Sequence, residues 1–148
     1  MIRQAMPSDE LKIRECAEQA YARYVPLIGR KPAPMVADFA TRITAGNVYV
    51  ATDEQLGFQG FIVFLFQGSH VLLENVAVLP HLAGRGVGKA LILFCENAAR
   101  DRGIGVVRLY TNEKMTENLS IYPRLGYAEM GRRAADGFNR VYFEKMLK

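Results

Sequence analysis

The first quarter of the chain has hydrophobic side chains at helical spacing. Residues 1–6 could form a short strand that ends at Pro7, and Ser8 or Asp9 then fits the N-cap of a helix. From there to about residue 24, apolar residues recur every three or four positions, which predicts an amphipathic helix. Proline and glycine interrupt the pattern between residues 26 and 34, and we expect a second helix over residues 35–45, stopped at Gly46.

The pattern then changes to strand-like runs. Residues 47–52, 58–67 and 70–79 are rich in β-branched and aromatic side chains, and short turns with glycine or serine separate them. Three such runs with short connections predict an antiparallel meander.

The second half returns to alternating helices and strands. A glycine-rich stretch at residues 84–88 precedes a helix expected over residues 89–102, and residues 106–111 form the next strand. A strand that follows a helical crossover pairs in parallel with the earlier sheet. A short helix over residues 116–124 should end at Gly126, and residues 127–133 and 139–146 should form a hairpin turned at Asp136 and Gly137. The predicted fold is α+β, with a mixed, mostly antiparallel central sheet flanked by helices.

Composition limits the class of protein. At 148 residues the chain has the length of one domain, which we place over residues 1–148, and half of its residues are hydrophobic. The net charge of +4 is modest and its Lys and Arg residues are dispersed, so we expect no nucleic-acid partner. No apolar run reaches the roughly 18–20 residues of a membrane span, and we expect no membrane association. Cys16 and Cys95 are too few for a disulfide framework, and with no signal peptide at the N-terminus we expect a cytoplasmic location.

The glycine-rich stretch carries the first sign of chemistry. A strand runs into Gly84, Gly86 and Gly88 and directly into a helix, where free N–H groups and the helix dipole favour phosphate. Arg85 and Lys89 add two cations. A Walker loop does not fit, because alanine stands at the position of its magnesium-binding hydroxyl, and the dinucleotide fingerprint is one residue out of register.

The stretch resembles the acetyl-CoA loop of the GNAT family of N-acetyltransferases, whose pattern is Gln/Arg-x-x-Gly-x-Gly/Ala. Gly86 and Gly88 match its fourth and sixth positions, whereas Ala83 departs from the first. The resemblance implies that the loop backbone holds the pyrophosphate of acetyl-CoA and that the preceding strand pairs with its pantetheine arm. The cofactor-binding residues so implied are Val76, Ala77, Val78, Gly84, Arg85, Gly86, Val87, Gly88 and Lys89.

A second family motif, Asn-x-x-Ala-x-x-x-Tyr-x-x-x-Gly-Phe, is matched downstream by Tyr122, Gly126 and Tyr127. Met115 stands at the motif's Asn position, and we expect Asn118, one helical turn later, to take over the contact with the cofactor arm. Pro123 is a further departure, which removes a helical N–H group.

These motifs imply catalytic roles for two residues. A lysine-like amine has a pKa of about 10.4, so attack on a thioester benefits from a base. Glu74 stands on the strand that faces the thioester in the family and is our candidate base, with a surface ion pair as the alternative. Tyr122 is our candidate general acid for the leaving thiolate, with a core tyrosine as the alternative.

The predicted activity is transfer of acetyl from acetyl-CoA, a co-substrate, to a primary amine, more readily of a small molecule than of a protein. The alternative is a non-catalytic acyl-CoA-binding or sensor module. We assign no metal, because His70 and His81 are isolated from other ligand types. Arg132, Arg133 and Arg140 could contact an acidic acceptor or the 3′-phosphate of the cofactor, or simply face solvent. A homodimer is possible.

Overall fold

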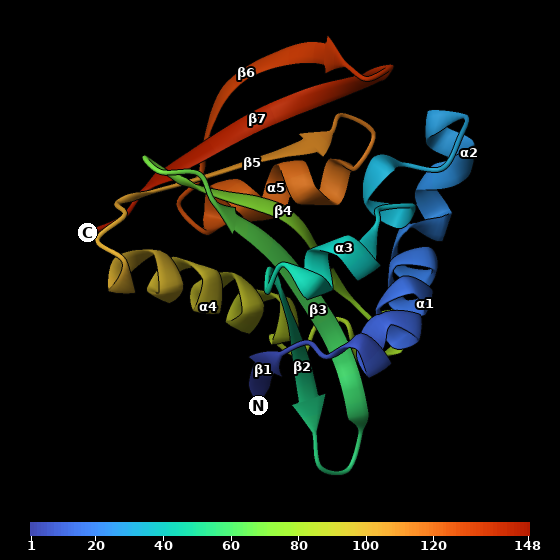
Figure 1. The fold of residues 1–148 in the computed structure, drawn as a ribbon. Helices are drawn as coiled ribbons and strands as arrows, with labels where there is room; N and C mark the ends of the chain where they lie inside the picture. Colours follow the sequence, from blue (N-terminus) through green and yellow to red (C-terminus); the bar gives the residue numbers. More distant parts are fainter. The chain divides into compact units, whose positions relative to one another are not determined.

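A computed structural model describes all 148 residues of the chain. Seven strands hydrogen-bond in the order β1-β2-β3-β4-β5-β7-β6, and Figure 1 draws them together with the helices α1 to α5. The parallel pairing of β4 with β5 makes the sheet mixed, because the other recorded pairs are antiparallel. The predicted fold class is confirmed.

The chain divides into two compact units. The first comprises Met1–Phe64 and Glu74–Cys95, and the second comprises Leu65–Leu73 and Glu96–Lys148. The placement of a single domain over residues 1–148 stays a prediction.

The first unit opens with β1 (Ile2–Gln4), which pairs antiparallel with β2 (Val48–Asp53), and β2 pairs with β3 (Gly57–Phe66). Between them lie α1 (Glu10–Tyr21), α2 (Val25–Ile28) and α3 (Phe39–Thr44). The helix expected over residues 35–45 is shorter than predicted at its start. Asp38 caps α3 by accepting from the N–H of Thr41, and Ala33–Met35 form a separate 3-10 turn.

The core of this unit is mostly aromatic and β-branched. Phe39 from α3 meets Phe61 of β3 edge-on at 5.3 Å between ring centres, and Tyr49 stacks on Phe64 at the same distance. Phe61, Ile62, Val63 and Phe64 are all buried, so the middle of β3 is covered on both faces. The strand β4 (Val71–Val78) then leads through a 3-10 turn (Pro80–Leu82) to α4 (Val87–Asp101).

In the second unit, β5 (Val106–Asn112) pairs along its whole length with β7 (Phe138–Met146), and β7 pairs with β6 (Ala128–Ala135) (Figure 1). The first residues of β4, Val71–Leu73, pair with β5 in the predicted parallel direction. The hairpin turns at Asp136 and Gly137, whose φ angles of 53° and 79° are the left-handed values that a two-residue hairpin turn needs. The helix α5 (Thr116–Arg124) ends at Gly126, which has a φ of 95°, as its C-terminal signal predicts.

A buried ion pair connects α4 with the end of the chain inside this unit. Glu96 is 1% exposed, and its two carboxylate oxygens accept from the hydroxyl of Tyr127 and from Nζ of Lys145, each at 2.9 Å. A buried carboxylate needs such partners, because an unpaired charge in the interior is costly.

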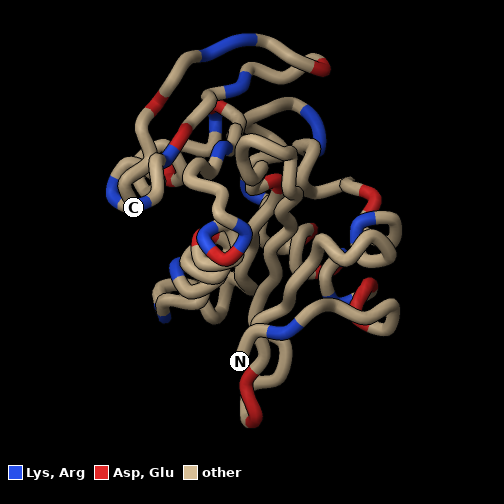
Figure 2. Tube along the Cα trace, turned by 60° about the vertical axis from the view of Figure 1, so that its left-hand side comes forward, with Lys and Arg blue, Asp and Glu red and all other residues tan.

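Lys and Arg residues are scattered along the trace between acidic ones (Figure 2). No helix in the chain combines the length and the apolar character that crossing a membrane requires. No group of three or more His, Cys, Asp or Glu side chains lies together as a metal ion would need.

Candidate active site

The strand β4 presents a strict alternation of buried and half-buried residues. Asn75 and Ala77 are buried, so Glu74, Val76 and Val78 share the opposite face of the strand. Gly60 of β3 lies against this segment so closely that a Cβ there would sit 2.5 Å from the carbonyl oxygen of Ala77. The glycine therefore permits the close approach of the two backbones.

The loop after β4 has the geometry of an anion cradle. Gly84 and Gly86 have φ angles of 80° and 84°, which residues with a side chain rarely adopt. The first backbone bond at the start of α4 is donated by Ala90 to the carbonyl of Gly86 at 3.0 Å. The N–H groups that precede Ala90 in the helix, those of Val87, Gly88 and Lys89, have no intrahelical acceptor and are free for a ligand.

Two cations accompany these N–H groups. Arg85 and Lys89 are exposed and neither has an ion-pair partner in the structure. A helix N-terminus with two uncompensated cations suits a pyrophosphate better than a single carboxylate. Gly88 lies where an added Cβ would be 3.6 Å from Val78, so the helix start sits close to the end of β4.

Glu74 forms an ion pair with Arg42, which the sequence alone did not indicate. Arg42 of α3 donates from Nε and from an Nη atom to the two carboxylate oxygens of Glu74, both at 2.8 Å. The side chain of Glu74 is 19% exposed. A bidentate pair fixes the orientation of the carboxylate and leaves each oxygen a second lone pair for another donor.

A tyrosine network holds the neighbouring residue of the strand. The hydroxyl of Tyr21, at the end of α1, lies 2.8 Å from both the Asn75 side-chain oxygen and the Val76 carbonyl oxygen. The amide nitrogen of Asn75 donates to the carbonyl of Pro34 at 2.9 Å. This network ties α1 and the turn at Pro34 to the strand next to Glu74.

The second motif lies in the other unit and is described there by itself. Tyr122 of α5 is 6% exposed, and its ring packs at 5.8 Å against the rings of Tyr127 and Phe143. Asn118 donates to the hydroxyl of Thr111 at 3.1 Å, and Met115 is buried at the start of the helix. The helix continues through Pro123 to Arg124, so the proline does not end it early.

Comparisons with known proteins identify the family of this chain. The family model described as the acetyltransferase (GNAT) domain matches residues 44–129, more than half of the chain, and the chain therefore belongs to the GNAT family of acetyltransferases. This range includes β4, the glycine loop and α5.

Among curated relatives, the mycothiol acetyltransferase of Rhodococcus jostii is 37% identical over 84 residues, which cover 53% of this chain and 28% of that protein. The thialysine N-epsilon-acetyltransferase of Sus scrofa is 27% identical over 60% of this chain and 51% of that protein. The match thus spans between a quarter and a half of the length of these two relatives.

Solved structures share the fold over nearly the whole chain. The PaiA N-acetyltransferase of Thermoplasma acidophilum, crystallised with coenzyme A, superposes with a TM-score of 0.78 at 17% identity over 99% of this chain and 98% of its own. Ard1 of Thermoplasma volcanium has the same TM-score at 19% identity, over 100% of this chain and 97% of its own.

Proposed function

We propose that this protein transfers the acetyl group of acetyl-CoA to the primary amine of a small molecule. The observation that carries the proposal is the cradle after β4, in which two glycines with positive φ, the free N–H groups of α4 and two uncompensated cations are arranged for a pyrophosphate. Membership of the GNAT family supports acetyl transfer, and curated relatives named for mycothiol and thialysine support a small acceptor.

The reaction itself requires four events. The neutral amine nitrogen attacks the thioester carbonyl carbon, the carbonyl oxygen becomes an oxyanion, the carbon–sulfur bond breaks, and the amine loses a proton. A backbone N–H of the segment from Val76 to Val78 would stabilise the oxyanion. Glu74 would take the amine proton, directly or through water, with the lone pairs that Arg42 leaves unused.

The departing thiolate needs a proton, and we propose Tyr122 as its donor. The support is the match of Tyr122, Gly126 and Tyr127 to the second family motif. A general acid contributes about 10²- to 10⁴-fold to the rate. The substitution Tyr122→Phe should lower the turnover number by at least tenfold, and an unchanged turnover number would remove the assignment.

Release of free thiol from acetyl-CoA, followed over a panel of small amines, tests the activity. Replacing Arg85 and Lys89 together by alanine should raise the KM for acetyl-CoA at least tenfold, because each charge-assisted bond contributes about 1.5–3 kcal/mol. Lys12→Ala removes one charge from an exposed position of α1 and should leave the KM unchanged. Binding of acetyl-CoA with no thiol release for any amine would instead favour a sensor.

The role of Glu74 has its own test. Glu74→Gln should depress the rate most at low pH, where the acceptor amine is mostly protonated. A loss of equal size at every pH would indicate that the residue binds or supports the site and does not accept the proton.

A further inference from the structure

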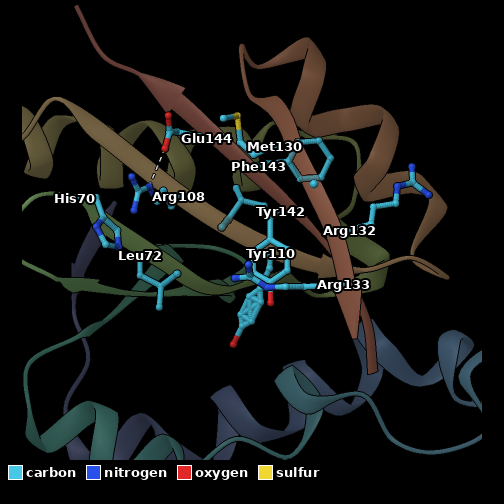
Figure 3. Close-up of a pocket in the computed structure, with 12 residues that line it drawn as sticks. His70, Leu72, Arg108, Tyr110, Met130, Arg132, Arg133, Tyr142, Phe143 and Glu144 are labelled. Carbon is cyan, nitrogen blue, oxygen red and sulfur yellow. Dashed lines mark hydrogen bonds and ion pairs between the residues drawn. The ribbon is translucent and has the colours of Figure 1, made fainter. Parts of the chain in front are cut away.

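A cavity lies within the C-terminal unit, against the strands of that unit. It has a volume of about 530 Å³ and is lined by β4, β5, β6 and β7 (Figure 3). This volume is within the range of small-molecule sites, roughly 300–1,000 Å³. Every residue that lines it belongs to the unit formed by Leu65–Leu73 and Glu96–Lys148.

The strand register determines which side chains face the cavity. Leu72 of β4 pairs with Arg108 of β5, and Arg108 pairs with Glu144 of β7. Two positions further along, Tyr110 pairs with Tyr142. Because side chains alternate along a strand, these residues share one face, while the intervening Val107, Leu109, Val141 and Phe143 are buried.

Two stacked tyrosines form an aromatic surface on that face. The rings of Tyr110 and Tyr142 lie 5.7 Å apart with an angle of 15° between their planes. The guanidinium of Arg140 lies 4.0 Å from the centre of the Tyr110 ring, and that of Arg133 lies 4.1 Å from the centre of the Tyr142 ring. The cation–π contacts place both guanidinium groups over the tyrosine rings, and each guanidinium has five N–H groups, more than its bond to the Tyr142 hydroxyl uses.

The charges around the cavity do not balance. Arg108 is paired with Glu144 at 2.7 Å, and Arg132 is paired with Glu129 at 3.1 Å. Arg133 has no carboxylate partner in the structure. The cavity wall therefore carries one uncompensated positive charge.

The titration of neighbouring groups agrees with this positive potential. Burial raises the pKa of Tyr142, but hydrogen bonds from Arg133 and Arg140 outweigh it and lower the pKa overall. At the other end, burial and the nearby Arg108 lower the pKa of His70, so the histidine adds no charge near neutral pH.

The cavity has unfilled space beside Arg133, at the position of Gly131. Gly131 of β6 lies opposite Tyr142, and an added Cβ there would meet no atom within 4 Å. Leu72 and Met130 add apolar surface near the charged groups. The cavity thus offers one guanidinium fork, an aromatic wall and a small apolar area.

We propose that this cavity binds the carboxylate of a small molecule, with Arg133 as the recognition residue. A planar guanidinium donates two parallel N–H bonds to a carboxylate, and the ring of Tyr142 limits the positions that the arginine can take. Neutral molecules of the same size lack this contact.

The test compares probes that differ only in charge. Calorimetry measures the binding of 6-aminohexanoate and of its neutral amide. We expect the acid to bind at least tenfold more tightly than the amide. Arg133→Gln should abolish this difference by weakening only the acid, whereas Gly131→Leu, which fills the space beside Arg133, should weaken both probes.

Arg124→Gln is the matched control, because it removes an exposed arginine of α5 in the same unit. It should leave both affinities unchanged. O-phosphoethanolamine separates a carboxylate site from a general anion site, and tighter binding of the phosphate than of the acid would overturn the carboxylate assignment.

Equal affinity for the acid and the amide, or a preference that survives Arg133→Gln, overturns the cavity as a carboxylate site. This result does not depend on whether the protein transfers acetyl groups.

Discussion

The buried pair between Glu96 and Lys145 makes a quantitative prediction about stability. The carboxylate side chain is 2% exposed and the lysine side chain 22% exposed. In Lys145→Met the carboxylate would keep only its bond from Tyr127 and would remain out of water. Removing one partner of a buried pair costs about 3–5 kcal/mol, which for a chain of this length lowers the melting temperature by roughly 6–20 °C.

The double substitution Glu96→Met with Lys145→Met distinguishes the contribution of the buried charge to stability from the contribution of side-chain packing. It removes both charges and keeps similar side-chain volume, so we expect it to be at least about 2 kcal/mol more stable than Lys145→Met alone. The Tyr127 hydroxyl would then lose its acceptor, which costs about 1–3 kcal/mol and keeps the double variant below the wild type.

Urea denaturation followed by circular dichroism measures these differences, with an unchanged m-value as the check that unfolding stays two-state. Arg132→Met is the surface control, because its pair with Glu129 is about half exposed and should contribute no more than about 1 kcal/mol. The reasoning is refuted if Lys145→Met costs no more than this control, or if the costs of Glu96→Met and Lys145→Met simply add.

Three further predictions concern the N-terminal unit. The pKa of Asp9 is lowered chiefly by its hydrogen bond with Arg3. This bond therefore stabilises the fold at pH values above the ordinary aspartate pKa, and the stabilisation is lost as the pH falls through the lower pKa of the folded state. Asp9→Asn should destabilise the protein at pH 7 and much less near pH 2, as measured by thermal melts. Gly60→Ala should lower the free energy of unfolding by about 1–3 kcal/mol in urea denaturation, because its methyl group would overlap the carbonyl oxygen of Ala77. An unchanged free energy of unfolding would show that β3 and β4 can move apart at this point without cost. Burial raises the pKa of Cys16 to about 12, so iodoacetamide at pH 8 should modify this thiol only after denaturant is added; rapid labelling of the native protein, read by mass spectrometry, would contradict this.

Local signals in the sequence were sufficient for most elements of the fold. Gly126 and the Asp136–Gly137 turn end α5 and form the last hairpin as predicted, because a left-handed residue leaves little choice of backbone. The parallel entry of β5 follows from the crossover rule. The start of α3 was predicted too early, because Asp38 caps the helix and Pro34 belongs to a separate turn.

The candidate site was predictable where it depends on the conformation of the backbone, and not where it depends on contacts between side chains that are distant in the sequence. The glycines after β4 indicate a left-handed backbone from the sequence alone. Arg42 is 32 residues from Glu74, and nothing local indicates that the two meet. The place of Arg133 over Tyr142 likewise depends on the register of a strand with an irregularity between residues 129 and 131, which the sequence does not indicate.

The Tyr21 hydroxyl has one hydrogen and two acceptors at equal distance, the Asn75 side chain and the Val76 carbonyl. Only one of them receives a full hydrogen bond at any instant. The carbonyl of Val76 can therefore exchange its bond for one from an incoming amide while the phenol keeps its bond to Asn75. Such an exchange leaves no polar group without a partner, so this peptide unit of β4 can change partners while Tyr21 still connects α1 to Asn75.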